Sequence, residues 1–197
     1  QPLGRAVGNA LEVREAVETL TGAGPRDLWA LTLELGAHLL VMSGLAADAD
    51  AARATLTRLR DSGAGARKLE ELIEAQGGDP RVVGDPDLLP AAPVVRPVDS
   101  GAAGPRWVAE ADARRIAEAA LALGAGRVRK DAPIDPAVGV VMAAGIGDRV
   151  EAGQPVAFIH ARSADQAAAA EAALRRALRF APGPTVTPGD DYEVVGE

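Results

Sequence analysis

Residues 123–161 read LGAGRVRKDAPIDPAVGVVMAAGIGDRVEAGQPVAFIHA, and this stretch decides the fold of the second half of the chain. Gly124 follows an alanine- and leucine-rich run, at a position typical of a left-handed glycine that ends a helix. Val138–Met142 and Val156–Ile159 are rich in β-forming residues, and the glycine-containing turn segment Gly145–Gln154 separates them. The stretch therefore predicts the end of a helix followed by two strands.

Further elements flank this pair of strands. Asp112 is a typical N-cap for the helix that ends at Gly124, and Ser163 with Gln166 forms the pattern of a capping box. In chain order, the sequence predicts a strand at 107–111, a helix from 112, a last helix at 164–179 and a final strand at 192–195. The second half is therefore expected to mix helices and strands.

Four helices are predicted between residues 9 and 77, each with its own start or stop signal. Asn9 and Glu12 fit a capping box for the first helix. The boundary residues are Asn9 and Gly22, Pro25 and Gly44, Asp48 and Gly63, and Gly77 after the fourth helix. We expect these helices to form one layer, followed by a proline-rich connector, residues 79–106, with one edge strand at Val94–Val98.

Leu28–Leu45 is the most apolar stretch of the chain, with apolar residues on several faces of the predicted helix. This pattern predicts deep burial. Glu34 and His38 lie near its centre, which favours a core helix over a membrane span.

Composition excludes several classes of function. The formal net charge is −7 and the isoelectric point is near 5.0, and no run of lysine and arginine offers a surface for nucleic acid or an anionic membrane. The chain has no cysteine, so disulfides and thiolate chemistry are excluded. A cytoplasmic location is expected, because cysteine-free chains suit a reducing compartment.

Two segments near the start, Gln1–Gly4 (QPLG) and Gly8–Ala16 (GNALEVREA), together with Leu123–Gly139, resemble the pyrimidine nucleoside phosphorylase family, which includes thymidine phosphorylase. The resemblance begins in the middle of the family's chain and implies a C-terminal portion. It implies an α/β fold with a helical part of the central domain at 1–92. A C-terminal α/β domain would follow at 93–197, shaped as an α/β hammerhead with a biotinyl-like β-hairpin.

The resemblance also implies an activity, the reversible phosphorolysis of a pyrimidine nucleoside in nucleoside salvage. Phosphate, the co-substrate, attacks C1′ and releases the free base and a pentose 1-phosphate. The family's phosphate- and base-binding residues lie upstream, so no catalytic residue is assigned to this chain and the chain alone is expected to be inactive. Its expected partners are the N-terminal half of the same enzyme and a second copy in a homodimer. Without the upstream portion, an exposed apolar face is expected.

One ion site follows from the same resemblance. The family binds a potassium ion partly through two backbone carbonyls and a glutamate, whose spacing corresponds to Leu3, Ala6 and Glu15. Neutral carbonyls with one carboxylate suit a weakly charged cation better than magnesium, which demands octahedral geometry and keeps several waters. The alternative is that Glu15 is a solvated residue on the surface of a helix.

Two glycine-containing segments admit other interpretations. Gly124–Arg127 resembles a phosphate loop, but it follows a helix instead of preceding one, so a helix stop is favoured. Val140–Ala161 has the outline of a biotinyl or lipoyl carrier hairpin, but it contains no lysine to modify, and Lys130 precedes the first strand. A noncatalytic carrier-like or interaction module is the alternative function.

The remaining polar residues give no catalytic constellation. His38 and His160 are the only histidines and are far apart in the sequence, so both are interpreted as structural, with His160 at the end of a strand. Asp190 and Asp191 lie between prolines and glycines, which favours a solvated turn. The basic residues near the end of the last helix, Arg175, Arg176 and Arg179, are expected on its exposed face.

Overall fold

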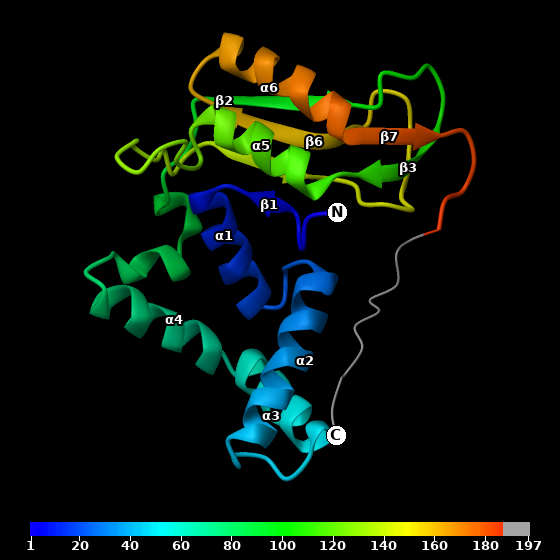
Figure 1. Ribbon diagram of the computed structural model, residues 1–197. Coiled ribbons are helices and arrows are strands. Elements are labelled where there is room, and N and C mark those ends of the chain that lie inside the picture. Colours follow the sequence, from blue (N-terminus) through cyan, green and yellow to red (C-terminus); the bar gives the residue numbers. More distant parts are fainter. Residues whose placement is uncertain (187–197) are drawn as a thin grey trace. The chain divides into compact units, whose positions relative to one another are not determined.

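The computed structural model describes residues 1–186 and separates the chain into two compact units (Figure 1). The first unit contains Gln1–Glu12 and the chain from Pro90 onward, and the second contains Val13–Leu89. The described residues form six α-helices and two antiparallel sheets, which confirms the mixed α/β class. The predicted strand at 192–195 and the pair Asp190 and Asp191 lie outside the described residues.

The larger sheet of the first unit has four antiparallel strands in the order β1-β4-β6-β2. Their bounds are β1 Ala6–Val7, β2 Val94–Asp99, β4 Gly139–Met142 and β6 Pro155–Ala161. The predicted pair of strands is thus confirmed as β4 and β6, and the predicted edge strand as β2. Pro97 is tolerated in β2 because an edge strand has one side without a ladder partner.

The second sheet has three antiparallel strands, β5 Arg149–Val150, β3 Arg106–Ala111 and β7 Leu178–Ala181, in that order. β7 corrects the prediction for the last helix, which ends at Ala177 instead of Arg179. Leu178 is extended and buried opposite Ala111, and Phe180 lies opposite Val108. Pairing with β3 therefore overrides the helix propensity of these residues.

This change of element corrects the interpretation of Arg179 alone, because Arg175 and Arg176 lie exposed on α6 as predicted. Arg179 lies on β7 and pairs with Glu110 of the neighbouring strand. Arg175 remains on the helix, where it also binds Glu171 and the backbone carbonyl of Asp99. The two arginines therefore attach the last helix and the last described strand to their neighbours.

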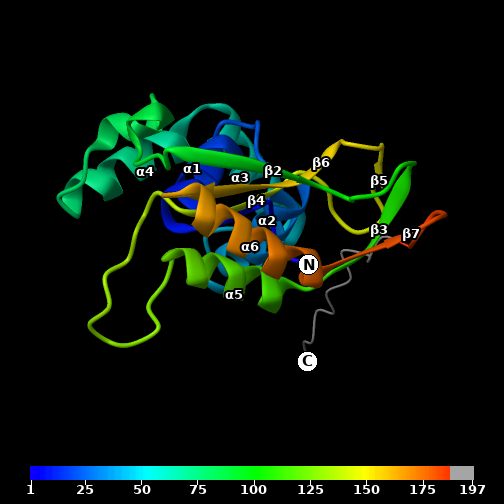
Figure 2. The same cartoon turned by 90° about the horizontal axis from the view of Figure 1, so that it is seen from above.

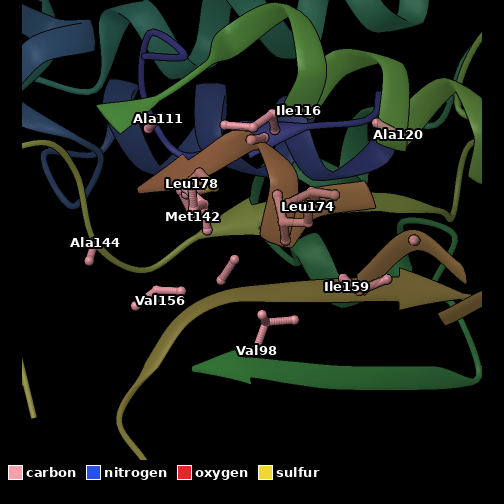
Figure 3. Packing of buried hydrophobic residues seen from close by; sticks show 14 of the residues in the cluster. Val98, Ala111, Ile116, Ala120, Met142, Ala144, Val156, Ile159, Leu174 and Leu178 are labelled. Atoms are coloured by element: carbon pink, nitrogen blue, oxygen red, sulfur yellow. The ribbon is translucent and has the colours of Figure 1, made fainter. Parts of the chain in front are cut away.

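Helices α5 (Ala113–Leu123) and α6 (Ala164–Ala177) lie side by side against the four-stranded sheet (Figure 2). The core between the two helices and the sheet contains large aliphatic side chains from both the helices and the strands. Ile116, Ile159 and Leu174 are fully buried there (Figure 3). Buried alanines on α6 let the helix approach the sheet closely. Because the chain has few aromatic residues, this core consists mainly of alanine and branched aliphatic residues.

Capping fixes where these two helices begin. The Asp112 carboxylate accepts a hydrogen bond from the Arg115 N–H at 3.1 Å, as predicted. The Ser163 hydroxyl accepts one from the Gln166 N–H at 3.2 Å. The Gln166 side chain in turn accepts from the N–H of Arg162, one residue before the cap. Both predicted helix starts are confirmed.

The second unit contains most of α1 (Asn9–Leu20), the helices α2 Arg26–Met42, α3 Ala49–Asp61 and α4 Ala64–Ala75, and two short 3-10 turns, η1 Pro80–Val83 and η2 Pro86–Leu88. The four predicted helices are confirmed. Asp48 caps α3 by accepting from the Ala51 N–H at 2.8 Å. The buried core of this unit is small and consists of Val17, Val82 and Val83, with half-buried side chains packed against it.

The prediction that α2 is deeply buried is wrong, because Ala37 is its only buried residue. Within this unit α2 packs against α3, where Ala37 and Ala52 are both fully buried. A Cβ added to Gly36 would lie 2.8 Å from Leu56, so the two helices approach closely on this one side. Most other apolar residues of α2 are half-buried, and Leu35, Leu39 and Met42 are exposed. No helix in residues 1–186 is long and apolar enough to cross a membrane.

Candidate functional site

The first two predicted ion ligands, Leu3 and Ala6, lie at the start of the first unit. Ala6 is on β1 opposite Val141 of β4, and the Met142 N–H donates to the Arg5 carbonyl at 2.8 Å. In an antiparallel pair, hydrogen-bonded and non-hydrogen-bonded residues alternate. Ala6 is therefore a non-hydrogen-bonded position, and its carbonyl points away from β4, as the proposed ligand role requires.

Gly8, which follows β1, and Gly139, the first residue of β4, let the backbone after β1 contact the backbone at the start of β4. A Cβ on Gly8 would lie 2.5 Å from the Val138 carbonyl oxygen, and one on Gly139 would overlap the Val7 carbonyl oxygen. Both glycines have positive φ, 151° and 156°. The backbone segments thus touch directly, which explains why glycine occupies both positions.

The third predicted ligand, Glu15, is on α1 and is only 7% exposed. This burial contradicts the alternative of a solvated helix-surface residue. A buried carboxylate is costly unless a cation or hydrogen-bond donors compensate it. Leu3 and Ala6 belong to the first unit and Glu15 to the second, so the joint geometry of the three stays a prediction.

The start of α1 differs from the predicted capping box. The Glu12 carboxylate reaches back as expected, but it accepts from the N–H of Gly8 at 2.9 Å, one residue before Asn9. The Asn9 side chain instead donates to the Ala125 carbonyl at 2.6 Å. The cap moves to Gly8 because the close contact there excludes a side chain, and Asn9 becomes a link to the end of α5.

The segment Gly124–Arg127 is confirmed as a helix stop. Gly124 has a φ of 105°, its N–H donates to the Leu121 carbonyl, and the Ala125 N–H donates to the Ala120 carbonyl. These two hydrogen bonds define a Schellman motif, in which the backbone amides are used to end the helix. They are therefore not arranged to bind phosphate.

Asp135, in the loop after this helix stop, binds a partner that sequence analysis did not find. Its carboxylate accepts two hydrogen bonds from Arg162, at 2.6 and 2.7 Å, and one from the Ala137 N–H at 3.1 Å. The Asp135 N–H donates to the Gly124 carbonyl. Because of the Arg162 guanidinium, the pKa of Asp135 lies below its usual range, although desolvation opposes this shift. The pair connects the loop to the end of β6.

We predict that Asp135→Asn destabilises the protein at pH 7 and that this effect disappears in acid. A lowered folded-state pKa means that the carboxylate stabilises the fold above its unfolded pKa of about 4. The stabilisation is lost as the pH falls through the folded pKa. Urea unfolding between pH 7 and strongly acidic pH measures the difference between wild type and variant. Asp131→Asn removes an exposed charge from the same loop as a control, and an equal effect of both variants would refute the role of the ion pair.

Both histidines have structural surroundings. His38 Nε2 lies 3.2 Å from the Glu34 carboxylate, which also accepts two hydrogen bonds from Arg53 of α3. The bonds to Arg53 lower the pKa of Glu34 below its usual value. His160 lies within β6, opposite Gly139 and Val95, and not at the strand end that was predicted.

Other candidate chemistry is not assembled in residues 1–186. Lys130 lies between α5 and β4, outside the β4–β6 hairpin on which a carrier would present its lysine. Within this described range, no three histidine, cysteine, aspartate or glutamate side chains gather as a metal cluster would require. A shallow groove of about 420 Å³ between the start of α1 and α5 is lined mainly by small residues, and Arg114 and Glu118, which also line it, form an ion pair on the surface of α5.

Comparisons with known proteins give a single answer. Residues 107–181, from β3 through α5, β4–β6 and α6 to β7, match the model of the pyrimidine nucleoside phosphorylase C-terminal domain. The chain is 43% identical over 165 residues to a pyrimidine-nucleoside phosphorylase of Staphylococcus aureus (strain bovine RF122 / ET3-1), a match that covers 84% of the chain and 38% of the relative. It is 44% identical over 161 residues to the enzyme of the same name from Bacillus subtilis (strain 168), covering 82% of the chain and 37% of that relative. The chain thus spans less than two fifths of the length of these relatives.

Proposed function

Since the chain belongs to the pyrimidine nucleoside phosphorylase family, we propose that it forms the C-terminal portion of an enzyme that cleaves pyrimidine nucleosides with phosphate. In this reaction an oxygen of phosphate bonds to C1′ as the bond from C1′ to the base breaks. The products are the free base and a pentose 1-phosphate, and the reaction is reversible.

One observation carries this proposal: identity of 43–44% to two enzymes of this name over more than four fifths of the chain. The match to the C-terminal domain model supports it, because residues 107–181 include both α5 and α6 and most of both sheets. Because each match covers more than 160 of the 197 residues, it includes residues of both units.

The described residues would act as a scaffold in this enzyme. Phosphorolysis depends on holding phosphate and nucleoside in line and on stabilising charge that develops on the sugar and the base. We propose that the groups that do this are not among residues 1–186, because the resemblance places the family's phosphate- and base-binding residues upstream. The substrate-binding groups are therefore assigned to the rest of the enzyme, beyond this chain.

We further propose that Leu3, Ala6 and Glu15 contribute ligands to a potassium site. The direction of the Ala6 carbonyl and the burial of Glu15 support this assignment. Two neutral backbone carbonyls and one carboxylate would suit a weakly charged cation of this kind.

The resemblance supports several finer proposals about the complete enzyme. These are a central-domain part at 1–92, a C-terminal domain at 93–197 of the hammerhead type with a biotinyl-like hairpin, a homodimer, and a cytoplasmic location. The antiparallel β4–β6 pair supports the hairpin assignment, and the absence of cysteine supports the location.

The decisive experiment measures the phosphate-dependent release of thymine and uracil. We expect no release by the 197-residue chain alone. Release is expected when the chain is joined to the part of the Bacillus subtilis relative that lies outside the match. The reason is that the groups that bind phosphate and base belong to that part. Potassium is expected to support activity better than sodium, and Glu15→Gln is expected to remove this preference.

Two outcomes would refute these proposals separately. Turnover by the chain alone, or none by a folded joined protein, would contradict the assignment of function. An unchanged preference for potassium in Glu15→Gln would contradict the ion site and leave the phosphorolysis assignment in place. Glu18→Gln, on the same helix, serves as the matched control for loss of a carboxylate.

A further inference from the structure

A stripe of large apolar side chains runs along one side of α2. Leu35, Leu39 and Met42 are 58%, 65% and 82% exposed, and Leu45, just past the helix end, is 77% exposed. Leu35, Leu39 and Met42 follow one another at spacings of four and three and therefore lie on the same face of the helix, and Leu45 lies beyond the helix end. We call these four residues the α2 stripe.

The stripe cannot be covered by repacking α2 against its neighbour in the second unit. The opposite side of α2 is already fixed to α3 through the fully buried Ala37 and the close approach at Gly36. Glu34 adds two hydrogen bonds to Arg53 of α3. Rotating the stripe inward would break these contacts and separate Glu34 from Arg53.

The stripe differs from the other exposed leucines of the second unit. Leu59 lies between Arg58 and Arg60, and Leu72 follows Glu70 and Glu71, so charged residues adjoin each of them. Exposed leucines in such surroundings are normal on a protein surface. All four residues of the stripe are apolar. An exposed apolar patch of this kind usually marks a surface that another part of a protein covers.

We propose that the α2 stripe is the contact surface for an apolar part of the phosphorylase polypeptide that lies outside this chain. The matched relatives are more than twice as long as the aligned part, so most of their length is available to cover it. An uncharged apolar stripe selects an equally apolar partner, because burying charged groups against it would leave them unpaired. This inference rests on the proposed function, since it takes the rest of that enzyme as the occupant.

The absence of cysteine makes a direct test possible, because a single introduced thiol reports burial without background from this chain. Leu39→Cys places the thiol on the stripe, and Leu72→Cys, with a native side chain that is 51% exposed, places a control on α4. Each variant is reacted with N-ethylmaleimide as the chain alone and joined to the unmatched part of the Bacillus subtilis enzyme. Peptide-resolved mass spectrometry gives the rate at each thiol.

We expect the thiol at position 39 to react at least about tenfold more slowly in the joined protein, because it becomes reactive only when the contact opens. The thiol at position 72 should change by less than about twofold, since it remains exposed. Met42→Cys repeats the measurement at a second stripe position, in case Leu39→Cys perturbs the fold. Circular dichroism of each variant checks the helices.

Equal rates at positions 39 and 42 in both proteins would overturn the proposal. Protection that already exists in the chain alone and rises with protein concentration would identify a second copy as the occupant, which also overturns it. A joined protein that protects the stripe but releases no base would refute the proposed function alone. One that releases base while the stripe stays reactive would refute this inference alone.

Discussion

Gly139→Ala is expected to lower the free energy of unfolding by about 3 kcal/mol, the largest effect that we predict for any single backbone position. The new Cβ would overlap the Val7 carbonyl oxygen and lie 3.0 Å from the Gly8 Cα, both of them backbone atoms. These atoms cannot move aside without separating β1 from β4. The positive φ of 156° adds strain of its own.

Urea unfolding of the variant measures this effect. Gly153→Ala is the matched control, because Gly153 also has a positive φ, 74°, but a Cβ there meets no atom within 4 Å. It isolates the cost of the left-handed conformation, about 1 kcal/mol. If both variants lose the same stability, the close approach of the two backbone segments is not what makes glycine necessary at position 139.

Leu174→Ala is expected to destabilise the protein by about 3 kcal/mol, because it leaves a cavity between α6 and the four-stranded sheet. Leu174 is fully buried in the core of the first unit, and the alanines on either side, Ala170 and Ala177, are too small to fill the space (Figure 3). For a chain of this length, such a loss lowers the melting temperature by roughly 6–12 °C.

Thermal unfolding followed by circular dichroism tests this second prediction. Leu72→Ala removes the same atoms from a half-exposed site on α4 and should cost less than about 1 kcal/mol. A similar loss in both variants would mean that the α6 contact contributes no more than an ordinary surface leucine.

The sequence predicted most helix boundaries because their causes are local. Asp48, Asp112 and Ser163 each cap the helix that follows, and Gly124 ends α5 by a Schellman motif. A cap depends on three or four neighbouring residues, all of which are visible in the sequence. Strands β4 and β6 were found for a similar reason, since β-forming residues surround a glycine-containing turn.

Features that depend on distant partners were missed or mispredicted. Arg179 has good helix propensity, but pairing with β3, far away in sequence, places it on a strand. The apolar residues of α2 show which positions favour burial, but not whether a neighbour covers them. Of the candidate site, the resemblance supplied Leu3, Ala6 and Glu15, whereas the ion pair of Asp135 and Arg162 gave no local signal. The burial of Glu15 likewise required the structure.

The pairing of β1 with β4 has a consequence for the order in which the chain folds. Ala6 and Val7 find their partners only at Val141 and Val140, and the Gln1 side chain accepts a hydrogen bond from the N–H of Ile146. On the ribosome, the residues of the second unit emerge between these two segments and complete their helical contacts first. The strand partners of Ala6 and Val7 therefore become available only after more than a hundred further residues have been synthesised. The β1–β4 edge of the four-stranded sheet can therefore form only after β4 has been synthesised.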